Sequence, residues 1–257
     1  MSLIDVDNLR GKVKEMYRAV ADEPHGTFHF EMGYDLAARL GYPTDELDQI
    51  PREAVESFAG VGYHLGLAEL QPGDRVVDLG SGSGMDAFIA AGRVGGAGEI
   101  VGVDMTDQQL AKARRLAERD RITNARFEQG YIENAPVRDE WADAVISNGV
   151  INLCSDKAAV FREIARMLKP DGRMAISDIV TEHQLTEAIV CDVNLWASCI
   201  GGAMQQDDYR AAIEAAGLEV RAVRENPEYQ FISDSAQGAT TTFGVKSICV
   251  LAVKHTG

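Results

Sequence analysis

Hydrophobic positions in the middle of the chain form short runs that alternate with helical patterns. The runs predict five strands, at 75–79, 99–103, 125–129, 142–147 and 172–178. Between them, apolar residues three and four positions apart predict three helices, at 85–94, 106–120 and 155–168. Because parallel strands are joined by helical crossovers, this alternation predicts a doubly wound, mostly parallel α/β sheet.

The C-terminal part of the chain departs from this alternation. Its pattern predicts helices at 184–200 and 207–216, followed by strands at 218–224 and 245–253. No long helical pattern lies between the last two strands, so we expect them to pair antiparallel at an edge of the sheet. The complete prediction is a seven-stranded, mostly parallel sheet with antiparallel C-terminal edge strands.

Residues 1–68 are predicted to form a helical N-terminal extension. One face of a helix over 9–21 carries the apolar residues Leu9, Val13, Met16, Tyr17 and Val20. Glycines and prolines then divide 22–66 into short helices. The extension either covers a site as a lid or packs passively on the main domain, which is expected at 69–257 with acceptor-site elements in 179–244.

Two helix starts are predicted from local sequence. Thr106 and Gln109 have the spacing of a capping box, in which each side chain bonds the backbone N–H of the other position. Ser155 is placed to cap the third helix.

The charge balance narrows the range of partners. Forty acidic residues against 25 basic ones give a formal net charge of −15, which repels nucleic-acid phosphates and anionic membrane surfaces. The sequence has no apolar run long enough for a bilayer and no leader pattern, so we expect a cytoplasmic protein acting on a small molecule, without nucleic acid or membrane. The four cysteines lack zinc-binding spacing, and no metal site is predicted.

A glycine turn joins a predicted strand to a helix in the stretch Arg75-Val-Val-Asp-Leu-Gly-Ser-Gly-Ser-Gly-Met-Asp86. Glycines let a backbone approach a ligand closely, and the N–H groups at a helix start attract negative groups. The glycines do not fit the nicotinamide pattern G-x-G-x-x-G, whose third glycine would stand at Met85. No Gly-Lys-Ser or Gly-Lys-Thr follows, which excludes a phosphate-binding P-loop.

Two carboxylates indicate what the turn holds. Asp78 lies in the strand just before the turn and suits an ammonium group rather than a pyrophosphate. Asp104 ends the second strand, twenty residues after Gly84, where a carboxylate is able to accept both ribose hydroxyls. Together they point to S-adenosylmethionine as the cofactor.

These motifs resemble those of the class I S-adenosylmethionine-dependent methyltransferases. Residues 76–84 resemble the first motif of that family, 102–104 the second, and 166–173 the turn before its fifth strand. The resemblance implies a Rossmann-like fold, an adenine site at 130–133 and a wall at 147–150 near the transferred methyl group. The cofactor-binding residues expected from the motifs and the resemblance are Tyr17, Asp78, Gly80, Ser81, Gly82, Ser83, Gly84, Asp104, Met105, Gly130, Tyr131, Ile132, Glu133, Asn148, Gly149 and Val150.

Further stretches resemble the arsenite methyltransferases, at 102–106, 146–153, 198–203 and 244–248. That family holds trivalent arsenic with three thiols. This chain matches one of them, Cys199, but has Gly149 at a second position and Ala59-Gly-Val-Gly-Tyr63 around the third. Cys199 and Asn148 are therefore the catalytic candidates, and two ligands of a three-thiolate site are missing.

Three functions remain open. The leading interpretation is methyl transfer to a small-molecule acceptor, with a soft sulfur or metalloid acceptor favoured by the narrower resemblance. The alternative is C- or O-methylation of a hydrophobic metabolite such as a quinol or phenol, which usually needs a general base. No histidine in the sequence has the context of such a base. The third is a protein that binds S-adenosylmethionine without catalysis.

Overall fold

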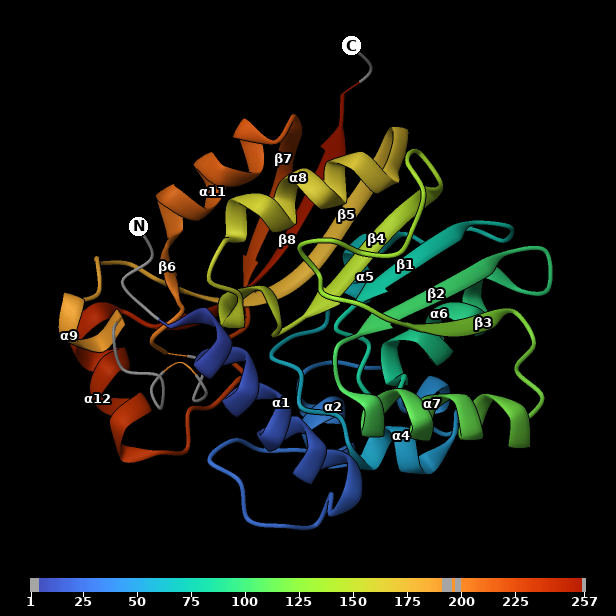
Figure 1. The fold of residues 1–257 in the computed structure, drawn as a ribbon, viewed down its shortest axis with the longest axis horizontal. Helices are drawn as coiled ribbons and strands as arrows, with labels where there is room; N and C mark the ends of the chain where they lie inside the picture. Colours follow the sequence, from blue (N-terminus) through green and yellow to red (C-terminus); the bar gives the residue numbers. More distant parts are fainter. Residues whose placement is uncertain (1–4, 191–195, 197–199, 256–257) are drawn as a thin grey trace.

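An eight-stranded sheet forms the centre of the computed structural model, which describes residues 5–190, 196 and 200–255 (Figure 1). Seven strands lie in the order β3-β2-β1-β4-β5-β8-β7, and β6 pairs with β5 beside them. The strands are β1 Arg75–Leu79, β2 Glu99–Asp104, β3 Ala125–Gln129, β4 Ala142–Asn148, β5 Leu168–Thr181, β6 Met204–Gln205, β7 Leu218–Glu225 and β8 Lys246–Lys254.

Strand directions agree with the predicted topology. Neighbouring strands pair in parallel across the part β3-β2-β1-β4-β5 of the sheet. The β8 strand runs antiparallel to both of its neighbours, β5 and β7. This confirms the doubly wound sheet with an antiparallel C-terminal edge. The eighth strand, β6, was not predicted because its two residues are too short to show an alternating pattern.

Helices cover both faces of the sheet. On one face lie α6 Met85–Val94 and α7 Asp107–Arg119, and on the other α8 Lys157–Met167 and α11 Gln206–Ala215 (Figure 1). Side chains alternate along β1 accordingly: Val76 packs in the same cluster as Phe88, and Val77 in the cluster of Phe161. The sheet is therefore buried on both faces, as its near-continuous apolar strands require.

The N-terminal segment is helical, as predicted. It contains α1 Val6–Asp22, α2 Tyr34–Arg39, α3 Thr44–Leu47, α4 Arg52–Glu56 and α5 Leu65–Ala68. Leu9, Val13 and Val20 are buried on one face of α1, in agreement with the predicted docking face. Figure 1 shows this helix beside the carboxyl ends of β1 and β4.

Thr106 is the N-cap residue of α7 as predicted, but the capping box is absent, and the predicted cap of α8 is wrong. The side chain of Thr106 makes no cap bond at the start of α7, and Gln109 is turned away to other partners. At the start of α8 the cap is Asp156, whose carboxylate accepts from the N–H of Ala159, and not Ser155. Since Asp and Ser are both good N-cap residues, adjacent positions are not distinguished by sequence.

Two predictions for the C-terminal part of the chain differ from the structure or are described by it only in part. The connection from β7 to β8 contains a ten-residue helix, α12 Asp234–Phe243, where no long helix was predicted. Of the predicted helix at 184–200, the described residues include α9 Glu187–Val190. Cys191 and Cys199 lie outside the described residues.

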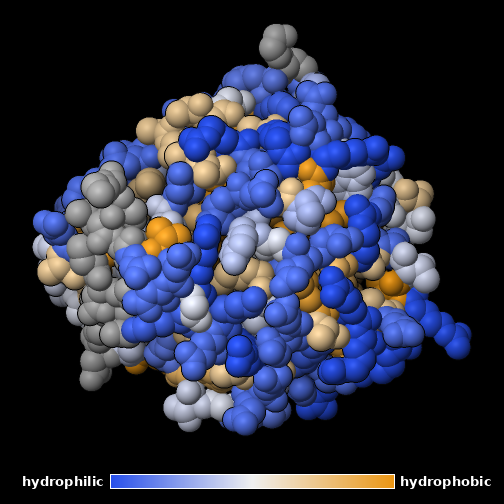
Figure 2. Space-filling view, in the orientation of Figure 1, coloured by the Kyte–Doolittle hydropathy of each residue, from blue (hydrophilic) through white to orange (hydrophobic). Residues whose placement is uncertain are grey.

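The surface is mainly hydrophilic on the face that Figure 2 shows, where apolar side chains form small separate patches. None of the helices in the described part of the chain combines the length and apolar composition needed to cross a membrane.

Candidate functional site

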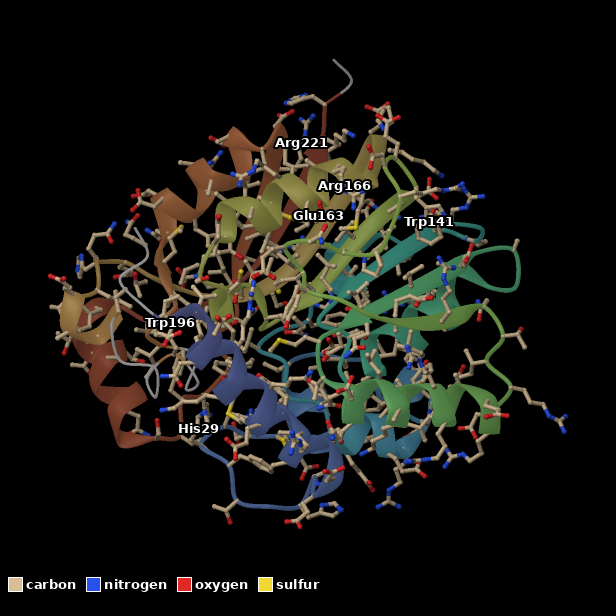
Figure 3. All side chains as sticks on the ribbon, in the orientation of Figure 1. His29, Trp141, Glu163, Arg166, Trp196 and Arg221 are labelled. Atoms are coloured by element: carbon tan, nitrogen blue, oxygen red, sulfur yellow. The ribbon has the colours of Figure 1, made fainter. Side chains whose placement is uncertain are left out.

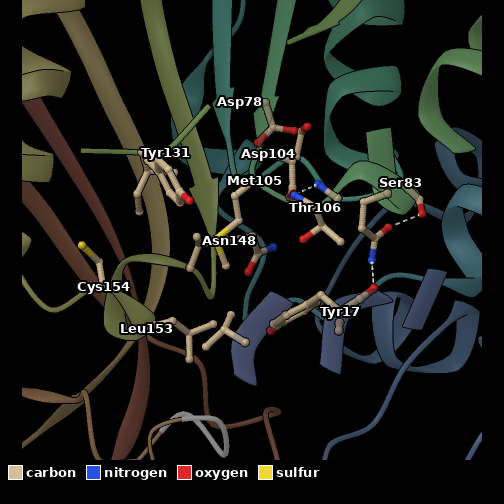
Figure 4. A pocket seen from close by; sticks show the side chains of 18 of the residues that line it. Tyr17, Asp78, Ser83, Asp104, Met105, Thr106, Tyr131, Asn148, Leu153 and Cys154 are labelled. Atoms are coloured by element: carbon tan, nitrogen blue, oxygen red, sulfur yellow. Dashed lines mark hydrogen bonds between the residues drawn. The ribbon is translucent and has the colours of Figure 1, made fainter. Parts of the chain in front are cut away.

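A pocket lies at the ends of β1, β2 and β4, between the sheet and α1 (Figure 4). Nearly all of the expected cofactor residues line it: Tyr17, Asp78, Gly80, Ser81, Gly82, Ser83, Asp104, Met105, Gly130, Tyr131, Ile132, Glu133, Asn148 and Val150. Gly84 and Gly149 were expected there but do not border the pocket. Cys199, the other catalytic candidate, is outside the described part of the chain.

The glycine turn takes its shape from the crowding of β1 against β4. Ser147 donates its hydroxyl to the carbonyl of Leu79 at 2.8 Å, which draws the ends of these two strands together. Gly80 has a φ of +73°, and a Cβ at this position would overlap the side chain of Val150. Only glycine fits both the backbone angle and the contact. The first glycine of the motif therefore brings the turn against the β4 side of the pocket.

Asp104 holds the glycine turn to the end of β2. One carboxylate oxygen accepts from the N–H of Gly82 at 2.9 Å, and the other accepts from the N–H of Thr106 at 2.8 Å. Burial raises the pKa of Asp104, and these hydrogen bonds act in the opposite direction. The carboxylate borders the pocket while it organises the turn that forms the pocket floor.

Asp78 is a buried carboxyl group with an incomplete set of partners. Its side chain is 2% exposed, and its Oδ2 has no hydrogen-bond partner among the described residues. Burial, followed by the nearby Asp86 and Asp104 carboxylates, raises the pKa of Asp78 well above its usual range. Buried charges are normally paired, so this oxygen fits a cationic group of a ligand in the pocket.

Asn148 joins the end of β4 to the N-terminal segment. Its Oδ1 accepts from the N–H of Val61 at 2.8 Å, and its Nδ2 donates to the hydroxyl of Tyr42 at 3.0 Å and the carbonyl of Gly62 at 2.9 Å. Tyr42 in turn donates to Asp86 at 2.6 Å. These bonds occupy the carboxamide of Asn148 within the protein, which suits a positioning role better than direct catalysis.

The turn is also linked to α1 through α7. Ser83 and Gln109 are hydrogen-bonded at 2.5 Å through their side-chain oxygens, and the amide nitrogen of Gln109 donates to the carbonyl of Tyr17 at 2.9 Å. Figure 4 draws this connection across the pocket. Gln109 thus couples the first glycine motif to the helix that covers it.

Arg10 connects α1 to the opposite side of the pocket. Its guanidinium donates to Glu133 at 3.0 Å, and its Cζ lies 4.4 Å from the centre of the Tyr131 ring. Among the described residues that line the pocket, Arg10 is the one with a cationic side chain. The α1 helix therefore contacts the residues expected to flank the adenine.

The two ends of the pocket differ in polarity. Carboxyl, hydroxyl and amide groups gather over β1 and β2, whereas the part toward β4 and α1 is mainly apolar, with Val6, Leu9, Val13, Phe58, Val150 and Leu153. Leu9 and Leu153 continue into a buried cluster that contains Trp196 and Ile200. Figure 3 labels Trp196, which lies near α1. One end thus suits a polar nucleoside and the other an apolar or uncharged acceptor.

Among the described residues that line the pocket, Cys154 is the one thiol. Gly149 has a φ of +69°, and a Cβ there would lie 3.2 Å from the side chain of Val61. Gly149 therefore lies next to Val61, within the stretch 59–63 where the resemblance implies another thiol. Cys154 does line the pocket, but burial raises the pKa of its thiol to about 12, with Glu133 as the next cause. A thiol that stays protonated is a weak ligand.

Sequence reasoning missed three of the groups that shape the site. Arg10 lies beside the apolar stripe of α1, and nothing in its local sequence indicates partners more than 100 residues away. Asp86 belongs to the glycine stretch itself and was available as a signal there. Gln109 was interpreted as a capping residue. No cluster of three His, Cys, Asp or Glu side chains suited to a metal ion occurs in the described residues.

Comparison with known proteins gives matches over most of the chain. A family model described as a methyltransferase domain matches residues 70–217. Arsenite methyltransferase of Halobacterium salinarum is 38% identical over 197 residues, which cover 76% of this chain and 50% of that protein. Arsenite methyltransferase of Aquipseudomonas alcaligenes is 38% identical over 198 residues, covering 74% of this chain and 56% of that protein.

A solved structure gives a similar result. The arsenic(III) S-adenosylmethionine methyltransferase from Chlamydomonas reinhardtii superimposes with a TM-score of 0.68 and 30% sequence identity, over 88% of this chain and 75% of that chain. The chain spans about half the length of the two curated relatives above.

Proposed function

Because the chain belongs to the S-adenosylmethionine-dependent methyltransferases, we propose that it catalyses methyl transfer from this cofactor to a small-molecule acceptor. The observation that carries the proposal is the pocket itself. It combines a glycine turn, a buried carboxyl group whose Oδ2 has no partner among the described residues, and a second carboxylate at the end of the next strand. All three were expected from the sequence for S-adenosylmethionine.

The polar end of the pocket is proposed to bind the cofactor. Asp78 would take the ammonium group, since its Oδ2 is buried and has no other partner among the described residues. Asp104 would take the ribose hydroxyls, and residues 130–133 would flank the adenine. A cation next to Asp78 would also offset the cost of burying its carboxylate.

The bound cofactor supplies a methyl group on a positively charged sulfur, which an acceptor displaces in line. The protein aligns the acceptor with the methyl group and excludes water from the reacting atoms. Asn148 fixes residues 61 and 62 against the end of β4, and α1 covers the pocket from the other side. Because the described residues of the wall include no histidine, the best acceptor is one that needs no protein base.

A soft sulfur or metalloid nucleophile meets this requirement. The similarity to arsenite methyltransferases supports the same class of acceptor. The missing thiols at Gly149 and residues 59–63 argue for a binding mode other than three thiolates. The specific second candidate is a hydrophobic metabolite such as a quinol or phenol, which the apolar lining of the β4 end favours.

Release of S-adenosylhomocysteine tests these possibilities directly. The protein is assayed with arsenite, sulfide, small thiols, quinols and phenols, each with wild type and Cys199→Ser. Turnover of arsenite, sulfide or a thiol supports the soft-acceptor proposal, and exclusive turnover of quinols or phenols replaces it with the second candidate. If arsenite turnover is absent and Cys199→Ser leaves another activity intact, a three-thiol mechanism is excluded. Tight cofactor binding without any turnover would leave a binding protein.

A further inference from the structure

One face of α1 forms a wall of the cofactor pocket. Val6, Leu9, Arg10, Val13 and Tyr17 all line it, and each lies three or four positions from another member of the set. The groups opposite are withdrawn from solvent by protein alone: Asp104 is 9% exposed and Gln109 is 2% exposed. The helix thus covers polar groups that a cofactor has to reach.

The C-terminal end of α1 is held by buried hydrogen bonds. Gln109 donates to the carbonyl of Tyr17 at 2.9 Å, and Lys112 donates to the carbonyl of Ala21 at 3.2 Å. Lys112 also donates to Ser57 at 2.7 Å, which fastens this end of the helix to the next segment. Both Lys112 and Ser57 are buried, so these bonds are protected from competition with water.

The N-terminal half is held by a more accessible contact. The ion pair between Arg10 and Glu133 has side-chain exposures of 37% and 18%, and Tyr131, on which the guanidinium lies, is 44% exposed. Half-exposed ion pairs and cation–π contacts are individually weak and sensitive to salt. The C-terminal end of α1 is therefore held by buried polar bonds, whereas its N-terminal half combines the buried Leu9 and Val13 with a polar contact that water and salt reach.

We propose that Arg10 is a latch residue that holds α1 over the cofactor pocket and sets how fast the cofactor enters and leaves. When the contacts to Glu133 and Tyr131 break, the N-terminal half of α1 lifts while the Tyr17–Ala21 end stays attached. This rests on the proposed function, since it takes the pocket as a cofactor site. The contacts of Arg10 close the pocket equally in the free and the cofactor-bound protein. Loss of these contacts therefore changes the association and dissociation rates together and leaves the affinity nearly unchanged.

Binding kinetics of S-adenosylhomocysteine test the latch. Arg10→Ala is expected to raise the association and the dissociation rate constants by the same factor, about three- to tenfold, with a Kd within about twofold of wild type. Arg10→Lys keeps the charge but loses the planar contact with Tyr131 and is expected to fall between. The matched control is Lys14→Ala, because Lys14 lies on the same helix as Arg10 and pairs with Asp107 of α7 at 3.6 Å but does not line the pocket.

Hydrogen exchange of the protein without ligand gives a second readout. Arg10→Ala is expected to speed exchange of amides around Leu9 to Val13 and to leave those near Ala21 unchanged. Unchanged rates and unchanged exchange in Arg10→Ala would overturn the latch. So would a rise in the dissociation rate with a parallel rise in Kd, which identifies Arg10 as a direct ligand contact. If wild type binds no S-adenosylhomocysteine, the proposed function fails, and the exchange experiment still decides on the latch.

Discussion

The buried aspartates of this protein differ in how their carboxyl groups are paired. Asp104 and Asp178 both accept hydrogen bonds from backbone N–H groups, whereas Oδ2 of Asp78 has no partner among the described residues. Burial raises the pKa of all three. Asp78 is therefore the residue where a cationic ligand gains most, and Asp104 and Asp178 serve the structure even without one.

Replacing Asp104 by alanine removes both the expected ribose contact and the bond that orients Gly82. We expect Asp104→Ala to weaken cofactor binding by more than about tenfold, which corresponds to about 1.4 kcal/mol. Calorimetric titration with S-adenosylmethionine measures this. Asp120→Ala is the control, since Asp120 pairs with the surface residue Arg119. Unchanged affinity in Asp104→Ala would refute the assignment of the ribose.

Asp178 is the third of these buried carboxyl groups and is not among the residues that line the pocket. It accepts from Tyr209 at 2.7 Å and from the N–H groups of Asn152 and Ile179, and burial raises its pKa from 3.8 to about 6. The folded state thus holds the proton more tightly than the unfolded chain. This contribution to stability is fully present below about pH 4 and is lost as the pH rises through about 6.

Asp178→Asn removes that titration while its carboxamide oxygen is still able to accept the backbone bonds. Relative to wild type, the variant should gain on the order of 3 kcal/mol in free energy of unfolding between about pH 4 and pH 7. Urea unfolding at a series of pH values gives the two curves. Glu118→Gln, an exposed change on α7, serves as control. Parallel curves for wild type and Asp178→Asn would contradict the assigned titration.

Some of these residues are visible in sequence and others are not, for a physical reason. Asp104 is found because its distance from the glycine turn is fixed by one strand-helix-strand unit. Asn148 is located by its motif, but its bonds to Tyr42 and Val61 depend on how a distant segment folds back. Arg10 has no local signal at all, because its partners lie 121 and 123 positions further along the chain.

Whole helices and strands were easiest to predict where their burial is regular. The β1 strand and α6 have the predicted bounds, since one ends at the glycine turn after the apolar Val76, Val77 and Leu79 and the other begins directly after that turn. The β5 strand is longer than the predicted 172–178, because Pro170 and the exposed Asp171 at its start interrupt the apolar run. Helix α12 was missed because Gly238 and three consecutive threonines, Thr240 to Thr242, favour helix weakly.

The start of α8 offers a direct comparison of two neighbouring cap candidates. Asp156 accepts from the N–H of Ala159 at 2.9 Å and is the residue that caps the helix. Asp156→Ala is expected to lower the free energy of unfolding by about 1 kcal/mol, and Ser155→Ala by clearly less. Urea unfolding of both variants at one pH measures the difference. An equal loss in both variants would contradict the assignment of Asp156, rather than Ser155, as the residue that caps α8.

The molecule as a whole is organised by how the N-terminal segment joins the sheet. Leu36, Leu47, Phe58 and Leu65 belong to the same core cluster as Val76 and Phe88. Ion pairs extend this contact, with Arg93 bound to Glu46 at 2.6 Å. The predicted boundary between residues 68 and 69 rests on a change in sequence pattern. Such a change reflects local secondary structure and does not show whether the two segments share a hydrophobic core. We therefore expect the two parts to unfold together.

Removing residues 1–68 tests this expectation. Each buried leucine or phenylalanine contributes roughly 2–5 kcal/mol, so the loss of the four named above is as large as the roughly 5–15 kcal/mol that stabilises a typical domain. The full chain should unfold in one step, with coincident curves from tryptophan fluorescence and far-ultraviolet circular dichroism. Residues 69–257 alone should show no cooperative transition and should bind a hydrophobic dye. A cooperative transition of similar midpoint in the shortened chain would mean that the extension is a separate covering, and that α1 acts on the pocket without supporting the fold beneath it.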